Sequence, residues 1–212
     1  MQVYLVRHGE TFCNTNHIHQ HEGVPLAEKG RRQAECAGNA LAHLAEPHLV
    51  SSDLARARET ADIIGKTLQR EVLVDSLFRE MRRPSSLFGK PYFGPYSLWV
   101  GFKLFLGSFF NSWHHSDEEN LYNVTMRIER ALAHLQSLSK THEHVVVVSH
   151  AVFITLMLTR LRRGKISVFA YALGILKLFQ VGNGSITHLS YECAGETCSW
   201  KIIEADNRAH LC

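Results

Sequence analysis

Short apolar runs alternate along the chain with longer segments in which apolar residues recur every three or four positions. The runs cover residues 2–6, 48–51, 72–74 and 144–148. Short runs of β-branched and aromatic residues are typical of buried strands. The last run contains consecutive valines, which predicts a strand covered on both of its faces.

The segments between these runs have the spacing of amphipathic helices. The clearest is 121–138, where we expect Arg127, Glu129 and Arg130 to face solvent. Further helices are predicted over 30–45, 54–68 and 152–161. Strands that alternate with helices in this way predict an α/β fold, a three-layer sandwich with a mostly parallel central sheet and helices on both faces.

The pattern changes near the C-terminus. Apolar residues over 175–181, a Gly-Asn-Gly-Ser turn at 182–185 and a second run over 186–191 predict a β-hairpin. Residues 199–204 predict one more short strand.

One segment, about 85–115, does not fit the alternation, because it is rich in aromatic residues and interrupted by Gly and Pro. We interpret it as a cap insertion in a single domain that spans residues 1–212. The cap either packs its own aromatic side chains, or forms a lid that selects a substrate with an apolar portion or buries an interface. We favour a mainly structural lid that also shapes the pocket.

The composition is that of a globular protein. The chain has 212 residues, 45% of them hydrophobic and 20% charged, which excludes a disordered chain. The net charge of +3 is small and dispersed, so we expect no nucleic-acid partner. The apolar stretch 145–159 contains Ser149 and His150 and ends at Arg160, which predicts no membrane span.

The five cysteines are odd in number and form no Cys-x-x-Cys pair. This pattern predicts neither a disulfide framework nor a structural zinc site, and it favours a reducing compartment. The first strand reaches Arg7 and His8 after a very short apolar run, which is unlike a secretory leader. We therefore predict a soluble, cytoplasmic protein, and the sequence is compatible with an oligomer.

Polar side chains follow the predicted strands at the points where the strands end. Arg7 and His8 follow the first strand, Arg56 lies shortly after the second, Glu80 follows the third and His150 follows the valine strand. In an open α/β sheet these positions face one crevice, where ligands bind. Guanidinium and imidazole donors in one pocket suit a phosphate group.

Three segments match a known family in the same order along the chain. Arg-His-Gly-Glu-Thr at 7–11 with Asn14, Ser-Asp-Leu-Ala-Arg-Ala at 52–57 and Val-Val-Ser-His at 147–150 resemble motifs of the histidine phosphatase superfamily, branch 1, the phosphoglycerate-mutase-like proteins. The chain departs from the family where Ala151 and Val152 replace glycines that often follow the second histidine. The insertion at 85–115 matches no family pattern.

The resemblance implies phosphoryl transfer with no cofactor and no metal ion. It implies that His8 is the nucleophile and forms a phosphohistidine. Arg7, Arg56 and His150 would hold the phosphate oxygens and stabilise the charge that develops in transfer.

The resemblance also implies the roles of two further residues. Asn14 would add an uncharged donor to the phosphate. Glu80 would protonate the leaving oxygen and later take a proton from water. Glu71 and Asp75 are the alternative acids, and Glu80 is preferred because the residues before it resemble the family's approach to this position.

Three functions follow, in order of preference. The first is a phosphomonoesterase that acts on a small phosphorylated metabolite or a phosphoprotein. The second is a phosphoglycerate-type mutase, and the third is a non-catalytic module that binds a phosphorylated ligand. The histidines at 17, 19 and 21 raise a minor alternative, a metal site, although no cysteine or paired carboxylate lies nearby. His19 or His21 could instead line the rim on the phosphate side.

Overall fold

A six-stranded sheet of order β3-β2-β4-β1-β5-β6 forms the centre of the protein. The computed structural model describes residues 1–175, 181–195 and 197–211. Neighbouring strands from β3 to β1 run parallel, whereas β5 is antiparallel to β1 and β6 is antiparallel to β5. The strands are β1 (Gln2–Arg7), β2 (His48–Ser51), β3 (Val72–Val74), β4 (His144–Ser149), β5 (Ile186–Ala194) and β6 (Thr197–Asn207).

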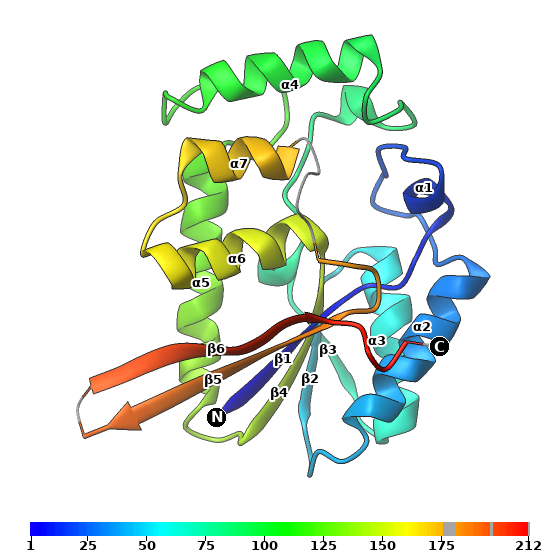
Figure 1. Ribbon diagram of the computed structural model, residues 1–212, viewed down its shortest axis with the longest axis vertical. Coiled ribbons are helices and arrows are strands. Elements are labelled where there is room, and N and C mark those ends of the chain that lie inside the picture. The colour runs from blue at the N-terminus through cyan, green and yellow to red at the C-terminus, as the bar shows by residue number, and fades with distance from the viewer. Residues whose placement is uncertain (176–180, 196, 212) are drawn as a thin grey trace.

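Helices cover both faces of the sheet (Figure 1). Helices α2 (Glu28–Leu41) and α3 (Ala55–Leu68) lie on one face, and α5 (Leu121–Leu138) and α6 (Ala151–Arg163) lie on the other. The remaining helices are α1 (Phe12–Thr15), α4 (Pro95–Gly107), α7 (Val168–Ile175) and two short 3-10 turns, Ser76–Phe78 and Ser85–Leu87.

The valine strand β4 divides the core into two layers. Val145 and Val147 pack with residues of α5 and α6, and Val146 and Val148 pack with residues of α2 and α3. All four are fully buried. Alternate side chains of a strand point to opposite faces, so an unbroken apolar run requires cover on both sides. The predicted three-layer α/β fold is confirmed.

The predicted C-terminal hairpin was wrong in its position. Ile175 ends helix α7, residues 176–180 lie outside the described part, and the Gly182–Ser185 turn leads into β5 without pairing two strands. The hairpin consists of β5 and β6, and β6 includes the strand expected at 199–204. Tertiary contacts of the 182–185 segment with the end of β1 determine its conformation, because Gly184 donates its N–H to the carbonyls of Arg7 and His8.

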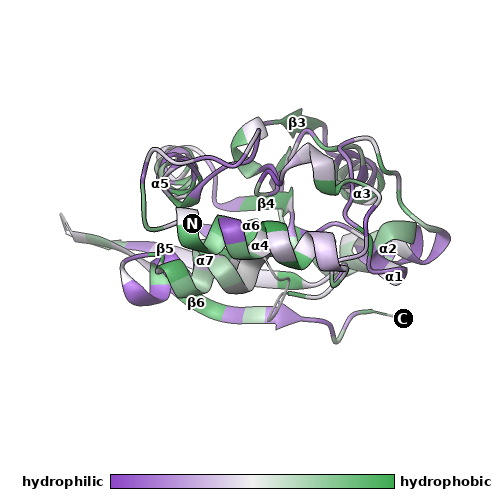
Figure 2. Ribbon diagram, turned by 90° about the horizontal axis from the view of Figure 1, so that it is seen from above, coloured by the Kyte–Doolittle hydropathy of each residue, from purple (hydrophilic) through white to green (hydrophobic). Residues whose placement is uncertain are grey.

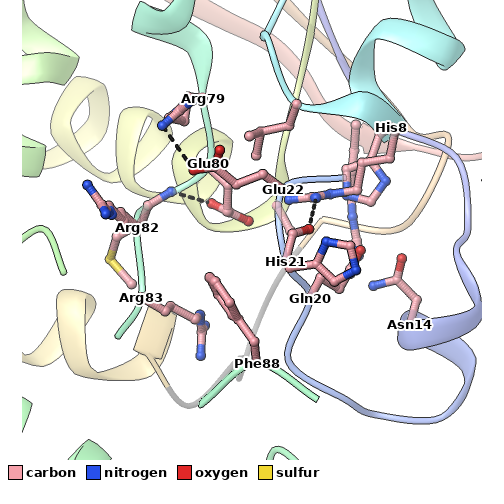
Figure 3. A pocket seen from close by; sticks show the side chains of 15 residues that line it. His8, Asn14, Gln20, His21, Glu22, Arg79, Glu80, Arg82, Arg83 and Phe88 are labelled. Atoms are coloured by element: carbon pink, nitrogen blue, oxygen red, sulfur yellow. Dashed lines mark hydrogen bonds and ion pairs between the residues drawn. The ribbon is translucent and has the colours of Figure 1, made fainter. Parts of the chain in front are cut away.

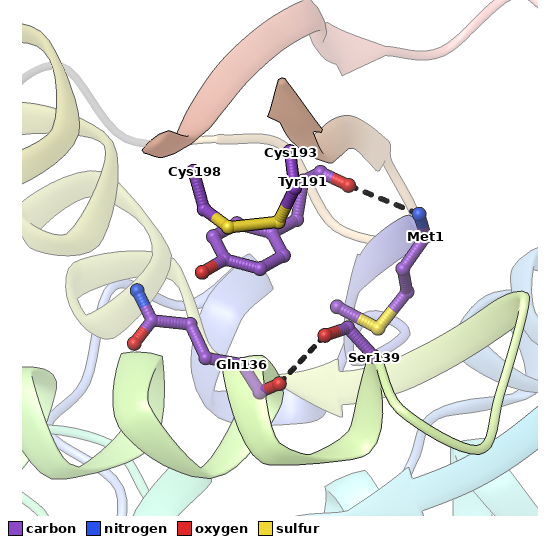
Figure 4. The surroundings of a disulfide bond; sticks show 6 residues. All are labelled: Met1, Gln136, Ser139, Tyr191, Cys193 and Cys198. Atoms are coloured by element: carbon purple, nitrogen blue, oxygen red, sulfur yellow. Dashed lines mark hydrogen bonds between the residues drawn. A yellow bond between two sulfur atoms is a disulfide. The ribbon is translucent and has the colours of Figure 1, made fainter. Parts of the chain in front are cut away.

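The prediction of no disulfide framework was also wrong, because Cys193 and Cys198 are joined by a disulfide (Figure 4). The two residues occupy directly paired positions of β5 and β6. The predicted hairpin turn at 182–185 did not suggest this pairing. The two cysteines lie opposite each other only because the hairpin pairs Ala194 with Thr197. The predicted cytoplasmic location stays a prediction.

The 85–115 segment contains one regular helix, α4, which lies over α7 at the top of Figure 1. Many of its aromatic side chains are exposed, among them Phe93, Trp99 and Phe102, so the segment does not simply pack its own aromatic residues. No helix in the described ranges combines the length and the apolar composition needed to cross a membrane.

Two glycines allow the loop after β1 to touch the start of α2. A Cβ on Gly9 would lie 2.2 Å from the carbonyl oxygen of Gly30, and a Cβ on Gly30 would lie 2.1 Å from that of Glu10. The obstructing atoms belong to the backbone and cannot rotate away. This contact fixes the position of the loop that carries His8.

We expect Gly30→Ala to lower the free energy of unfolding by about 1–3 kcal/mol, the usual cost of overpacking. Urea denaturation followed by circular dichroism measures the change. Gly94→Ala is the matched control, because the nearest heavy atom to its added Cβ is 3.5 Å away. Equal stability of the Gly30 variant and the wild type would contradict the contact.

Candidate active site

The ends of β1 and β4 bring the two predicted catalytic histidines together. Arg7 pairs with Ser149 in the parallel register of these strands, so His8 and His150 leave the sheet side by side. Their ring centroids are 5.1 Å apart, and both side chains are buried. The N–H of His8 donates to the carbonyl of Ser149, which continues the ladder to the site.

The orientation of His8 is fixed by its own loop. Its Nδ1 lies 2.7 Å from the carbonyl oxygen of Gly9, so this nitrogen carries a proton and donates it. Nε2 is therefore the unprotonated nitrogen, and it accepts from Nε of Arg56 at 3.3 Å. The ring presents a lone pair to the side of the pocket that holds the guanidinium groups.

The side chains of Arg7 and Arg56 are both buried, and burial weakens the affinity of each guanidinium group for its proton. Burial lowers the pKa of Arg7 to about 10, against the opposing effect of Glu80. Burial likewise lowers the pKa of Arg56. Arg7 donates from Nη1 to the carbonyl of Val181, while its Nε has no hydrogen-bond partner among the described residues.

His150 is fully buried and lies next to cations, and it is held neutral. Burial lowers its pKa well below the usual value, and Arg56 and His8 lower it further. Its Nε2 is 2.8 Å from Oγ of Ser52, at the end of β2. Within the described part of the chain its Nδ1 has no hydrogen-bond partner.

The Glu80 side chain lies beside the N-terminus of α6, the helix that begins directly after His150. Its Oε1 accepts the N–H groups of Met81 and Phe153 at 2.9 and 3.0 Å, and Oε2 accepts that of Val152 at 3.3 Å. A helix N-terminus favours a carboxylate, because its first N–H groups lack partners within the helix. Oε2 therefore keeps more of its hydrogen-bonding capacity for other groups.

Asn14 joins the pocket from α1. Its Oδ1 accepts from Thr11 and from Nδ2 of Asn183, which leaves the amide nitrogen facing the pocket (Figure 3). Asn183 also donates to the carbonyl of His8 at 3.1 Å. The sequence analysis missed Asn183, because it assigned this residue to a hairpin turn.

Arg127 was wrongly expected to face solvent. Its guanidinium forms a bidentate pair with Glu119 and donates to the carbonyls of Leu77 and Arg79, with a longer bond of 3.4 Å to that of Glu80. These bonds anchor the loop that carries Glu80. Periodicity placed Arg127 beside the apolar stripe of α5, but only the tertiary structure brings the loop to it.

The outer part of the pocket includes His21, as the sequence suggested for the rim, and further residues to which no role in the site was assigned. Arg83 lies on the Glu80 side, opposite His8 and Asn14, and Phe88 points toward the space between them (Figure 3). Other lining residues are Gln20, His21, Glu22, Arg79 and Arg82. Arg79 is already paired with Asp53 and Glu22.

The histidine triplet in the loop before α2 is dispersed. His21 lines the pocket, whereas His19 is buried against the ring of Tyr92, with centroids 4.9 Å apart. His17 accepts the N–H of Tyr92 at its carbonyl. Over the ranges that the structure describes, no group of three or more His, Cys, Asp or Glu side chains could hold a metal ion.

The sequence model of the histidine phosphatase superfamily (branch 1) matches residues 3–202. The chain belongs to this superfamily, as its motifs suggested. Structures of histidine phosphatases and other hydrolases share its fold. One is the mycobacterial glucosyl-3-phosphoglycerate phosphatase in complex with VO3 (TM-score 0.75, 26% identity, 95% of this chain and 97% of that chain). Another is a putative alpha-ribazole-5'-P phosphatase from Escherichia coli K-12, which at 21% identity supports the fold alone (TM-score 0.72, 97% of both chains).

A relative by sequence is the probable phosphoglycerate mutase GpmB of Salmonella paratyphi C (strain RKS4594). It is 42% identical over 82 residues, which is 38% of this chain and 38% of that protein. The aligned part thus covers well under two thirds of the relative's length. The comparisons identify a member of the histidine phosphatase superfamily.

The neutral, buried His150 should make this histidine phosphatase less stable in acid. In the folded protein the pKa of His150 is lower than the ordinary value of 6.5. Below pH 6.5 the unfolded chain therefore binds a proton at this residue that the folded chain does not bind. We expect the free energy of unfolding to fall as the pH drops from 6.5, with up to about 1.4 kcal/mol per pH unit from this residue. Denaturation at several pH values should give a flatter slope for His150→Gln. Equal slopes would contradict a neutral His150.

Proposed function

We propose that this protein hydrolyses phosphate monoesters through a phosphohistidine on His8. The observation that carries the proposal is the pair of contacts on the His8 ring. Nδ1 donates to the carbonyl of Gly9 and Nε2 accepts from Arg56. A nucleophile needs an unprotonated nitrogen whose lone pair has a fixed direction. The Gly9 contact leaves Nε2 unprotonated, and the hydrogen bond from Arg56 shows that its lone pair is directed toward the side where an anion would bind.

The surrounding charge favours a phosphate at this place. Arg7 and Arg56 are buried, and Glu80 is the carboxylate with the largest effect on both. Buried cations require an anion or hydrogen-bond acceptors nearby. We infer that Arg7, Arg56, Asn14 and Nδ1 of His150 donate to the non-bridging oxygens.

In the first step, Nε2 of His8 forms a bond to phosphorus as the ester P–O bond breaks. Glu80 gives its proton to the leaving oxygen, so the alcohol departs neutral. In the second step, water attacks phosphorus, Glu80 takes a proton from it and the N–P bond breaks. Inorganic phosphate is released and His8 returns to its neutral form.

The N–H groups of Met81 and Phe153 orient the Glu80 carboxyl, and Oε2 is the oxygen suited to exchange the proton. Glu71 and Asp75 were the alternative acids. Asp75 accepts from Leu77 and caps the 3-10 turn Ser76–Phe78. Neither Glu71 nor Asp75 lines the pocket, which supports Glu80.

The substrate is proposed to be a small phosphorylated metabolite or a phosphoprotein. A mutase is the second candidate, because Arg82 and Arg83 line the pocket beyond Glu80 and could hold a second anionic group. The name of the GpmB relative points the same way. Turnover of p-nitrophenyl phosphate in the presence of a chelator supports the esterase, whereas a requirement for a bisphosphoglycerate supports the mutase.

His8→Ala should abolish turnover, with a loss of at least about 10³-fold, because no other side chain takes over the nucleophile. Rapid quench of the wild type with labelled substrate should trap phosphate on His8 as an acid-labile, base-stable adduct. His21→Ala is the control, since it removes another imidazole of the pocket wall. Substantial activity in the His8 variant, or label on serine, would refute the covalent route.

Glu80→Gln should slow transfer from an alkyl phosphate by about 10²–10⁴-fold, the usual contribution of general acid catalysis. Transfer from an aryl phosphate should slow far less, because a phenolate leaves without a proton. Single-turnover formation of the phosphoenzyme is the measurement, since the steady state also contains the water step. Equal losses for both substrates would assign Glu80 a structural role, and phosphate should still inhibit the variant.

A further inference from the structure

Helix α4 exposes most of its large apolar side chains, and three of its five buried residues are Ser or Gly. A surface helix of a globular protein normally has the opposite arrangement. The buried face, which packs toward α7, consists of Ser97, Val100, Gly101, Leu104 and Gly107. The outward face and the turn after it form what we call the α4 ridge, which consists of Leu98, Trp99, Phe102, Leu106, Phe109 and Phe110.

The ridge is too exposed to be part of the core. Phe102 and Phe109 are each 61% exposed and Trp99 is 49% exposed. Leu98, Phe102 and Leu106 follow one another at intervals of four residues, so they lie along one side of the helix. Helix α4 is the outermost element at this end of the molecule (Figure 1), and seen from above it lies over α6 and α7 (Figure 2). A continuous apolar surface of this kind marks an interaction site.

The charges around the ridge are of one sign. Residues 81–116 and 144–191 contain no Asp or Glu. Lys103 lies over the ring of Trp99 at 3.9 Å, and Lys90 lies over that of Tyr96 at 4.8 Å.

The next carboxylates along the chain do not offset this charge. Asp117 pairs with Arg82, and Glu118 is buried and accepts the N–H groups of His115 and Ser116. The ridge is therefore an apolar surface bordered by Lys90 and Lys103, neither of which forms a salt bridge within the described part of the chain.

We propose that the α4 ridge docks on the surface of a membrane that contains anionic phospholipids. Phe and Leu side chains would enter the boundary between headgroups and acyl chains, and Trp and Tyr would stay at headgroup depth. The bordering Lys90 and Lys103 would meet lipid phosphates. The helix would lie in the plane of the interface and would not cross the bilayer.

A second copy of the chain fits the ridge less well. Two copies related by a two-fold axis would bring equivalent surfaces together, so cations of one copy would border those of the other. An anionic lipid surface complements the same charges. The proposal concerns a surface away from the catalytic pocket and does not depend on the proposed phosphatase activity.

Vesicle sedimentation tests the proposal with the full chain. We expect the protein to sediment with vesicles of phosphatidylcholine and phosphatidylglycerol, and far less with phosphatidylcholine alone. Raised salt should weaken the binding. The double variant Trp99→Ser/Phe102→Ser should reduce the partition coefficient by roughly tenfold or more. Leu73→Ser is the matched control, since it removes an exposed apolar side chain from the edge strand β3.

The charge component has its own pair of variants. Lys90→Glu/Lys103→Glu should weaken binding to anionic vesicles, whereas Lys140→Glu, a change of an exposed lysine on the loop after α5, should leave it unchanged. Circular dichroism establishes that each variant is folded.

Three results would overturn the proposal. The first is no sedimentation of the folded wild type with anionic vesicles. The second is binding that the ridge variant does not weaken. The third is a concentration-dependent dimer in analytical ultracentrifugation that Trp99→Ser/Phe102→Ser abolishes, which would assign the ridge to self-association.

Discussion

Positive charge buried at the carboxyl ends of β1 and β4 is the constraint on which the site depends. Arg7 and Arg56 lie beside two imidazoles, and desolvation lowers the pKa of both guanidinium groups. Such a cluster is costly unless acceptors surround it. The carbonyls of Val181 and His21, the ring of His8 and the carboxylate of Glu80 meet this need in part. A bound phosphate would supply the remaining acceptors for the two guanidinium groups.

The same charge determines how its neighbours behave. His150 stays neutral because burial and the neighbouring Arg56 and Arg7 disfavour a further positive charge in this place. Glu80 is the carboxylate that faces the cluster, and its position depends on α6 and on Arg127. Arg127 links α5 to the loop of Glu80 and stacks on Phe153, so the helix layer and the site share one network. A change in α5 would therefore affect the position of the Glu80 carboxyl without direct contact with it.

The loop after β1 depends on backbone contact as much as on charge. Gly9 and Gly30 allow the loop to rest on α2, and the N–H of Gly9 donates to Oγ1 of Thr60 in α3. On the opposite side, Asn183 holds the carbonyl of His8. Three separate elements thus fix a single imidazole, and this preorganisation is what phosphoryl transfer requires.

Local patterns of sequence were sufficient for the parallel part of the sheet and for most of the candidate site. The valine run required cover on both faces, and strand ends placed Arg7, His8 and His150 together, because parallel strands share one carboxyl edge. Turn residues did not determine where the C-terminal hairpin lies. The Gly-Asn-Gly-Ser segment satisfies a hairpin locally, yet its hydrogen bonds go to Arg7 and His8, far away in sequence.

Contacts between distant segments decided the rest. The Cys193–Cys198 bridge depends on the register of β5 and β6, which no spacing of two cysteines reveals. Whether Arg127 faces solvent or a loop depends on what packs beside α5. The apolar residues of α4 could be counted in the sequence, but only the position of α7 determined which of them are buried and which face outward. Periodicity identifies the faces of a helix, and the tertiary structure determines what covers each face.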